Sequence, residues 1–234
     1  MLTFDYTFIF EDQSEKKVRV QLDEESLNLV EEELSEYPEW TNLACSKHPH
    51  CKHNGETLHQ CPVGKSLVGL IDSFGNKQSY EKVKVTIETE ERTFLQDTTL
   101  QRGLSSLIGI YMVASGCPLM GKLKPMVRHH LPFATIEETI YRVISMYLLA
   151  QFFRAKEGKK PDWELAHLVS MYDDIQDVNK NLCDKLLSAT TKDASLNAVV
   201  ILNNFANMVP FSIDDDAFEE IQQLFKSYSD CSHH

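Results

Sequence analysis

Residues 103–114 constrain this chain more than any other segment, because they are almost wholly apolar and carry no charge. A helix that is apolar on every side has to be covered by other elements of the fold. We therefore expect residues 103–114 to form a central, buried helix. The chain has 234 residues, which is enough to build a sizeable core around such a helix.

Two pairs of segments with alternating polarity precede the central helix. The first pair is 1–10 with 17–22, and the second is 82–89 with 92–98. An alternation of apolar and polar residues is typical of a strand with one buried face. An acidic turn separates the members of each pair, so we predict two antiparallel hairpins that share one small sheet.

The remaining periodic segments predict helices. Thr135 and Glu138 form a capping box, which predicts a long helix that ends near Gly158. The other expected helices are 23–36 with an acidic face, 67–73, a short one from Pro118, one from Pro161 to Leu186, one from Asp193 to Met208, and 213–228. The predicted fold class is α+β, with N-terminal antiparallel hairpins followed by a C-terminal helical bundle.

We expect a single domain over residues 1–234. Its β-rich part is 1–98, which includes a cysteine and histidine loop at 40–61, and its helical bundle is 99–230. No repeat and no linker divides the sequence.

The charge of the chain narrows the classes of partner. Its formal net charge is -12, from 35 acidic and 23 basic residues, and such a surface repels nucleic acid. No uninterrupted apolar run approaches the roughly 20 residues that span a bilayer. The N-terminus lacks the pattern of a signal peptide. We therefore expect a cytoplasmic protein that binds neither nucleic acid nor membranes and whose thiols are reduced.

The cysteine and histidine loop has the composition of a metal site. Cys45, Cys51 and Cys61 stand in the pattern Cys-x5-Cys-x9-Cys, interspersed with four histidines. Thiolate and imidazole groups are the ligands that zinc and softer metals select. A loop without a core of its own would also gain its fold from a bound metal. The sequence therefore predicts one metal centre held by these three cysteines.

Two parts of the chain could supply the fourth ligand of that centre. Cys117 follows a glycine at the end of the predicted central helix, where a rigid element presents its thiol. His48 or His50 would instead close the site within the loop. Both Cys61 and Cys117 precede a proline, as cysteine ligands of bacterial ferredoxins do. Zinc is the predicted cofactor, with a 4Fe-4S cluster as the alternative.

The residue types leave three classes of function open. A site closed by four thiolates has no place for a substrate, so we predict a structural or sensing zinc site that joins the loop to the helical bundle. A metal-dependent or iron–sulfur redox enzyme is the alternative, as is a non-catalytic protein-interaction module that uses the acidic residues 23–36. A Cys117 nucleophile with His129 or His130 as its base is a further possibility.

One basic run stands out in this acidic chain, and it precedes the long helix that the capping box opens. Such a cluster at one end of a bundle predicts binding of a small anionic ligand or of an acidic partner protein. The candidate residues are Arg128, His129, His130, Glu137 and Arg142. The terminal His233 and His234 carry no weight in this argument.

Several stretches of the chain resemble an uncharacterised bacterial protein family. They are Ser115-Gly116-Cys117-Pro118, residues 130–135, 145–151, 88–93, 101–106 and 192–195. The resemblance covers most of the chain after Trp40. It implies a four-cysteine site formed by the 45–61 loop and the Gly-Cys-Pro step, and it implies no substrate, reaction or catalytic residue. The additional histidines of this loop leave the identity of the ligands open.

Overall fold

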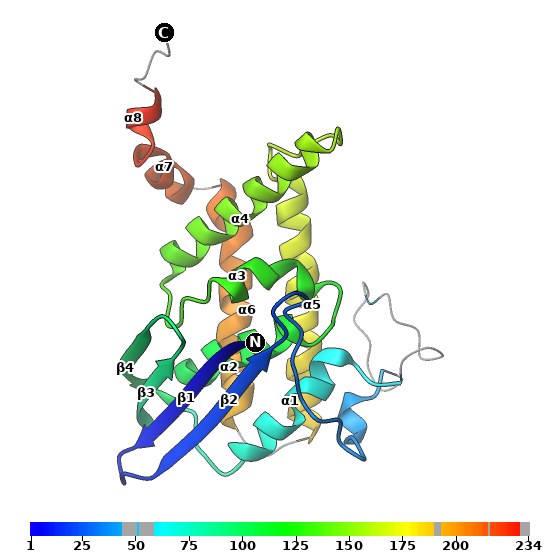
Figure 1. The fold of residues 1–234 in the computed structure, drawn as a ribbon, viewed down its shortest axis with the longest axis vertical. Coiled ribbons are helices and arrows are strands. Elements are labelled where there is room, and N and C mark those ends of the chain that lie inside the picture. The colour runs from blue at the N-terminus through cyan, green and yellow to red at the C-terminus, as the bar shows by residue number, and fades with distance from the viewer. Residues whose placement is uncertain (44–50, 52–58, 190–192, 215, 230–234) are drawn as a thin grey trace. The chain divides into compact units, whose positions relative to one another are not determined.

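The computed structural model describes residues 1–43, 51, 59–189, 193–214 and 216–229. It has an N-terminal antiparallel sheet and a mostly helical remainder, so the predicted α+β class is confirmed (Figure 1). Cys45, His48, His50, His233 and His234 lie outside the described residues.

The sheet has four strands in the order β2-β1-β3-β4, and every neighbouring pair is antiparallel. Both predicted hairpins are therefore confirmed, and they share one sheet because β1 also pairs with β3. The strands are β1 (Leu2–Phe10), β2 (Glu15–Leu22), β3 (Lys82–Glu88) and β4 (Thr93–Thr99).

One face of the sheet is buried because apolar side chains recur at every second position. On β1 these side chains are Phe4, Tyr6, Phe8 and Phe10, and all four are buried. Helix α2 (Leu100–Ala114) follows β4 directly and is buried along most of its length, as its apolar sequence predicts. It packs on β3 and β4 and on helix α1 (Pro62–Ser73).

Gly103 is the point of closest approach between α2 and the sheet. A Cβ atom built at this position would lie 2.9 Å from both Phe8 Cε1 and Val85 Cγ2. Real Cβ atoms do not come so close to other carbon atoms, so only glycine fits here without a shift of the helix or the sheet.

The prediction of a helix at residues 23–36 is wrong. Residues 23–38, called here the acidic segment, run as turns and extended chain with one isolated bridge, Leu22 to Leu29. The Leu29 amide donates to the Ala114 carbonyl at 3.0 Å, and the Val30 amide donates to the Gln21 carbonyl at 2.9 Å. These two amides donate to carbonyl groups of other segments, so they do not form the i to i−4 bonds of a helix.

Other helices differ from the sequence-based expectations mainly at their ends. Helix α1 begins at Pro62, earlier than expected, and the chain after Pro118 forms a 3-10 turn before a short helix. The helix expected from Pro161 begins only at Ala166. Before it, the Asp162 carboxylate accepts hydrogen bonds from the Tyr147 hydroxyl at 2.7 Å and the His167 amide at 2.8 Å. The elements concerned are η2 (Met120–Leu123), α3 (Lys124–Arg128) and α5 (Ala166–Ala189).

The capping box of the long helix is confirmed. Helix α4 (Ile136–Lys156) begins after Thr135, whose hydroxyl accepts the Glu138 amide while the Glu138 carboxylate accepts the Thr135 amide. Helix α6 (Asp193–Asp214) continues past the expected end at Met208 and through Pro210. The final expected helix is divided into α7 (Asp216–Gln223) and α8 (Lys226–Ser229).

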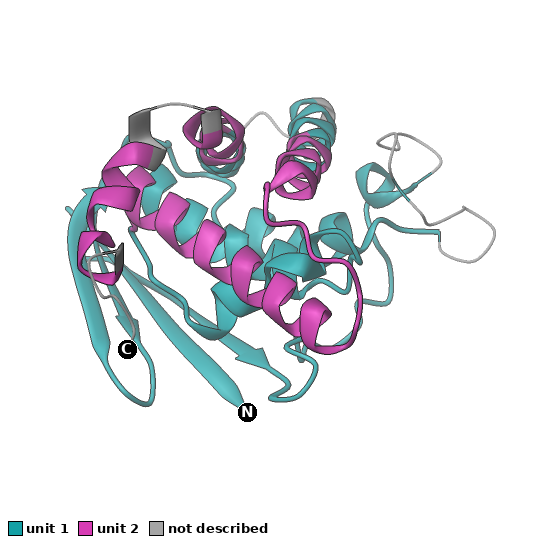
Figure 2. Ribbon diagram, turned by 90° about the horizontal axis from the view of Figure 1, so that it is seen from above, with its two compact units in different colours: residues 1–133, 177–203 teal, residues 134–176, 204–234 magenta. Residues whose placement is uncertain are grey.

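The chain divides into two compact units, shown in different colours in Figure 2. Unit 1 comprises residues 1–133 and 177–203, and unit 2 comprises residues 134–176 and 204–234. Helices α5 and α6 each contribute residues to both units. A single domain over the whole chain stays a prediction.

Among the described residues, one helix is long and apolar enough to cross a membrane by length and composition alone. It is Asp193–Ile213 of α6, with a mean hydropathy of 1.3. Core helices of proteins in water meet the same criterion, so this finding assigns no membrane location.

We expect Gly103→Ala to lower the free energy of unfolding by about 1–3 kcal/mol, because the added methyl group overpacks the contact between α2 and the sheet. Gly69→Ala is the matched control, since Gly69 also lies inside a helix but has no atom within 4 Å of a built Cβ. The control should gain up to about 1 kcal/mol from helix propensity. Urea denaturation measures both, and equal effects of the two substitutions would contradict the packing argument.

Candidate functional site

Cys117 sits in a tight turn that the end of α2 builds. The Ser115 hydroxyl donates to the Met112 carbonyl at 2.7 Å and accepts the Cys117 amide at 3.2 Å. Gly116 has φ +87, a left-handed conformation that glycine adopts without strain. The Cys117 side chain is buried, at 7% exposure, so the turn holds the thiol inward.

The sulfur of Cys117 has its own backbone donors. The amides of Leu119 and Met120 both hydrogen-bond to it, and the Gly121 amide donates to the Cys117 carbonyl at 2.8 Å. Amide donors of this kind stabilise negative charge on sulfur and fix its direction. The turn therefore offers a preorganised position for a thiolate.

Cys61 is held by the base of the cysteine loop. It is the N-cap residue of α1, and its amide donates to the Thr41 carbonyl at 2.7 Å. The bridge between Asn42 and Gln60 and the 2.8 Å bond from the Leu43 amide to the His59 carbonyl join the two ends of the loop. Cys61 thus lies where the loop returns to the folded core.

Two of the predicted ligands, Cys51 and Cys61, affect the Cys117 thiol electrostatically. The pKa of the Cys117 thiol is raised, first by burial and then by the nearby Cys61 and Cys51, while the two amide donors lower it. The three thiols come from the loop, the start of α1 and the turn after α2, and none is in a disulfide. A raised pKa is the reverse of the shift that activates a cysteine nucleophile.

A complete metal site does not appear within the part of the chain that the structure describes. No group of three or more His, Cys, Asp or Glu side chains there is arranged to hold a metal ion. Cys45, His48 and His50 lie outside this part, so the choice of the fourth ligand stays a prediction. His59, which is described, is exposed.

The candidate residues of the basic run are divided between the two units. Arg128, His129 and His130 belong to unit 1, whereas Glu137 and Arg142 belong to unit 2, so the structure does not test them as one site. Burial lowers the pKa of Arg142, and the neighbouring Glu138 and Tyr172 oppose that effect.

His130 belongs to a polar cluster between the sheet and α2. Its Nε2 atom lies 2.9 Å from the Tyr6 hydroxyl and 3.2 Å from the Ser106 hydroxyl, which are 3.0 Å from each other. Burial raises the pKa of Tyr6, so this phenol stays neutral. Sequence reasoning missed Tyr6 and Ser106, because only the fold brings residues so distant in the chain together.

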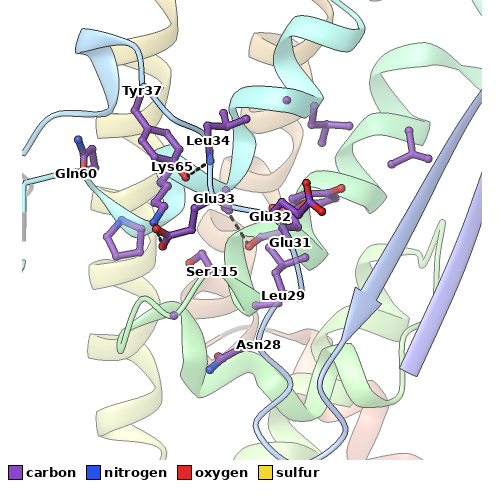
Figure 3. Close-up of a pocket in the computed structure, with 18 of the residues that line it drawn as sticks. Asn28, Leu29, Glu31, Glu32, Glu33, Leu34, Tyr37, Gln60, Lys65 and Ser115 are labelled. Atoms are coloured by element: carbon purple, nitrogen blue, oxygen red, sulfur yellow. Dashed lines mark hydrogen bonds and ion pairs between the residues drawn. The ribbon is translucent and has the colours of Figure 1, made fainter. Parts of the chain in front are cut away.

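A groove lies between the acidic segment, α1 and the end of α2 (Figure 3). Its volume is about 690 Å³. Gln60 and Pro62, on either side of Cys61, line it, and so do Ser115 and Gly116, which precede Cys117. Sequence reasoning missed this groove because it placed a helix where the acidic segment forms one of its walls.

Two carboxyl groups of the groove have a partner: Glu31 bonds with a tyrosine, and Glu33 pairs with a lysine. Burial of its carboxyl group raises the pKa of Glu31, and a hydrogen bond with the Tyr111 hydroxyl opposes that rise. Burial and the charge of Glu31 raise the pKa of Tyr111. Glu33 pairs with the Lys65 ammonium group at 2.8 Å.

The fold and these sites define an α+β protein with an acidic groove in its first unit. The chain belongs to the family of the domain of unknown function DUF6901, whose model matches residues 4–226. The resemblance to an uncharacterised family is thereby confirmed. No curated protein matches the chain, and neither does any solved structure.

We expect Cys117 to react slowly with iodoacetamide at pH 7 in metal-free protein, because its raised pKa leaves less of the reactive thiolate than in an ordinary cysteine. The rate should rise as the pH passes above the ordinary range of a thiol. Mass spectrometry of the labelled peptide measures the rate, and protein unfolded in urea is the reference. Equal rates in folded and unfolded protein would contradict the environment described for this thiol.

Proposed function

We propose that this protein binds one zinc ion in a structural or sensing site that joins the cysteine loop to the end of α2. Cys45, Cys51 and Cys61 are three of its ligands and Cys117 is the fourth, with His48 or His50 as the alternative fourth ligand. The observation that supports this proposal is the effect of Cys51 and Cys61 on the pKa of the buried Cys117 thiol.

The chemistry of the three side chains supports zinc. Thiolates in a tetrahedral arrangement are the usual ligands of structural zinc, and such sites leave no open position for a substrate. The two amide donors at Cys117 favour the thiolate form that a metal requires. Burial raises the pKa of Cys117 most and the neighbouring cysteines add to it, and a bound dication would remove this second effect.

Positive charge at the base of the loop supports the same proposal. Lys185 of α5 is buried at 4% exposure, and its ammonium group donates to the Asn42 carbonyl at 3.4 Å. A zinc ion with four thiolate ligands has a net negative charge, which a positive charge at the base of the loop would favour.

We expect protein purified without chelator and without a tag to contain about one zinc ion per chain and to be colourless. Elemental analysis and an absorbance spectrum measure this directly. Folded protein that neither contains nor takes up zinc would overturn the proposal. A brown protein with iron and sulfide would replace zinc with an iron–sulfur cluster and favour redox chemistry.

Cys117→Ser and Cys51→Ser should each lose most of the zinc and melt at lower temperature. At free zinc about a thousandfold above Kd, the ion stabilises the native state by about 4 kcal/mol, so the loss is measurable by thermal unfolding. Cys183→Ser is the matched control, because this half-exposed cysteine of α5 is not a proposed ligand. A Cys117→Ser variant with full zinc content would exclude Cys117 as a ligand.

A further inference from the structure

The groove has the dimensions of a site for a small molecule. Its volume of about 690 Å³ lies within the range of roughly 300–1,000 Å³ that such sites occupy. Its lining combines apolar side chains, among them Leu29, Leu34 and Leu70, with a small number of polar groups. A mixed lining of this kind fits a ligand with a hydrocarbon part and one or two polar ends.

The acidic wall of the groove determines the charge of the ligand. Glu31, Glu32 and Glu33 follow one another along it (Figure 3), and only Glu33 has a cationic partner among the residues that the structure describes. Lys17 also lines the groove, but its ammonium group pairs with Glu15 at 3.2 Å. Among the described residues this wall has more carboxylates than ammonium groups, so it repels an anionic ligand and attracts a cationic one.

Lys65 shows which kind of cation the wall accepts. Its ammonium nitrogen lies 2.8 Å from Glu33 Oε1 and 5.1 Å from the centre of the Tyr37 ring. A carboxylate and an aromatic ring together are a favourable environment for a primary ammonium group. The wall therefore already holds one ammonium group, supplied by the chain itself.

A second pairing of a carboxyl group with a tyrosine occurs in the same groove without a lysine. The Glu31 carboxyl group accepts the hydroxyl of Tyr111, a buried residue near the end of α2. Glu32 is the next residue along the wall. No Lys or Arg pairs with Glu31 or Glu32 in the described ranges, so this second position has the recognition groups but no ammonium group.

We propose that the groove binds a small aliphatic primary amine, whose ammonium group is held by Glu31 and Glu32 and whose carbon chain packs on Leu29 and Leu34. This site lies beyond the proposed zinc site and uses none of its ligands. Of the described cysteines, Cys51, Cys61 and Cys117 do not line the groove, although sequence neighbours of Cys61 and Cys117 do. Amine binding and zinc binding can therefore be tested separately.

Butane-1,4-diamine is the probe, titrated into the full chain at low salt by isothermal calorimetry. Glu31→Gln and Glu32→Gln should each weaken binding at least tenfold, because each removes one charge-assisted hydrogen bond while keeping the shape of the side chain. Glu36→Gln is the matched control, since this exposed residue of the acidic segment does not line the groove. The control should bind the diamine within about twofold of the parent.

Three results would overturn this inference. The first is no binding of the diamine up to roughly 10 mM, beyond which affinity carries little specificity. The second is an equal loss in the Glu36→Gln control, which would mean general attraction to an acidic surface. The third is displacement of the diamine by calcium at equal concentration, which would make the groove a divalent-cation site. Circular dichroism of each variant confirms that it is folded, and the zinc content of the same samples tests the proposed function independently.

Discussion

The close contact between α2 and the sheet at Gly103 fixes the positions of the other parts of unit 1. Because the helix backbone lies against Phe8 and Val85, neither the helix nor the sheet can shift without overlap. The N-terminal end of α2 continues directly from β4, and its C-terminal end carries the turn that holds Cys117. The Ala114 carbonyl at that end also binds the acidic segment through the Leu29 amide. One helix thus positions a thiol and one wall of the groove.

The elements that were predictable from the sequence depend on residues close in the chain or show a regular alternation of apolar and polar side chains. The alternation of Phe4, Tyr6, Phe8 and Phe10 predicts β1, and the capping box of Thr135 predicts the start of α4; both are confirmed. The acidic segment was mispredicted because the Leu29 and Val30 amides donate to Ala114 and Gln21, outside the segment, and not along a helix. The amphipathic pattern of its leucines is real, but tertiary hydrogen bonds override it.

Residue type alone suggested Cys117 as a partner of the loop cysteines, and this assignment stays a prediction. The structure adds that Cys51 and Cys61 contribute to the raised pKa of the Cys117 thiol. Ser106 and Tyr6 carry no local signal, since their cluster with His130 exists only after the sheet has packed on α2. The groove depends on the path of the acidic segment, so the wrong helix prediction concealed it.

The cysteine cluster and the groove share their supports. Cys61 caps α1 and Cys117 follows α2, and these two helices also line the groove on either side of the acidic segment. A metal ion held by both cysteines would fix the distance between the start of α1 and the end of α2.

Unit 1 consists of two separate stretches of the sequence, residues 1–133 and 177–203. This division affects folding during synthesis. Synthesis proceeds from the N-terminus at roughly 5–20 residues per second, and domains ordinarily fold as their sequence is completed. Here Ser79 binds Asp193, and Asn42 binds Lys185, so these contacts of the first 133 residues cannot form until residues 177–203 have been synthesised. The surface of α2 at Gly109, which Leu202 approaches, is likewise covered only at that stage.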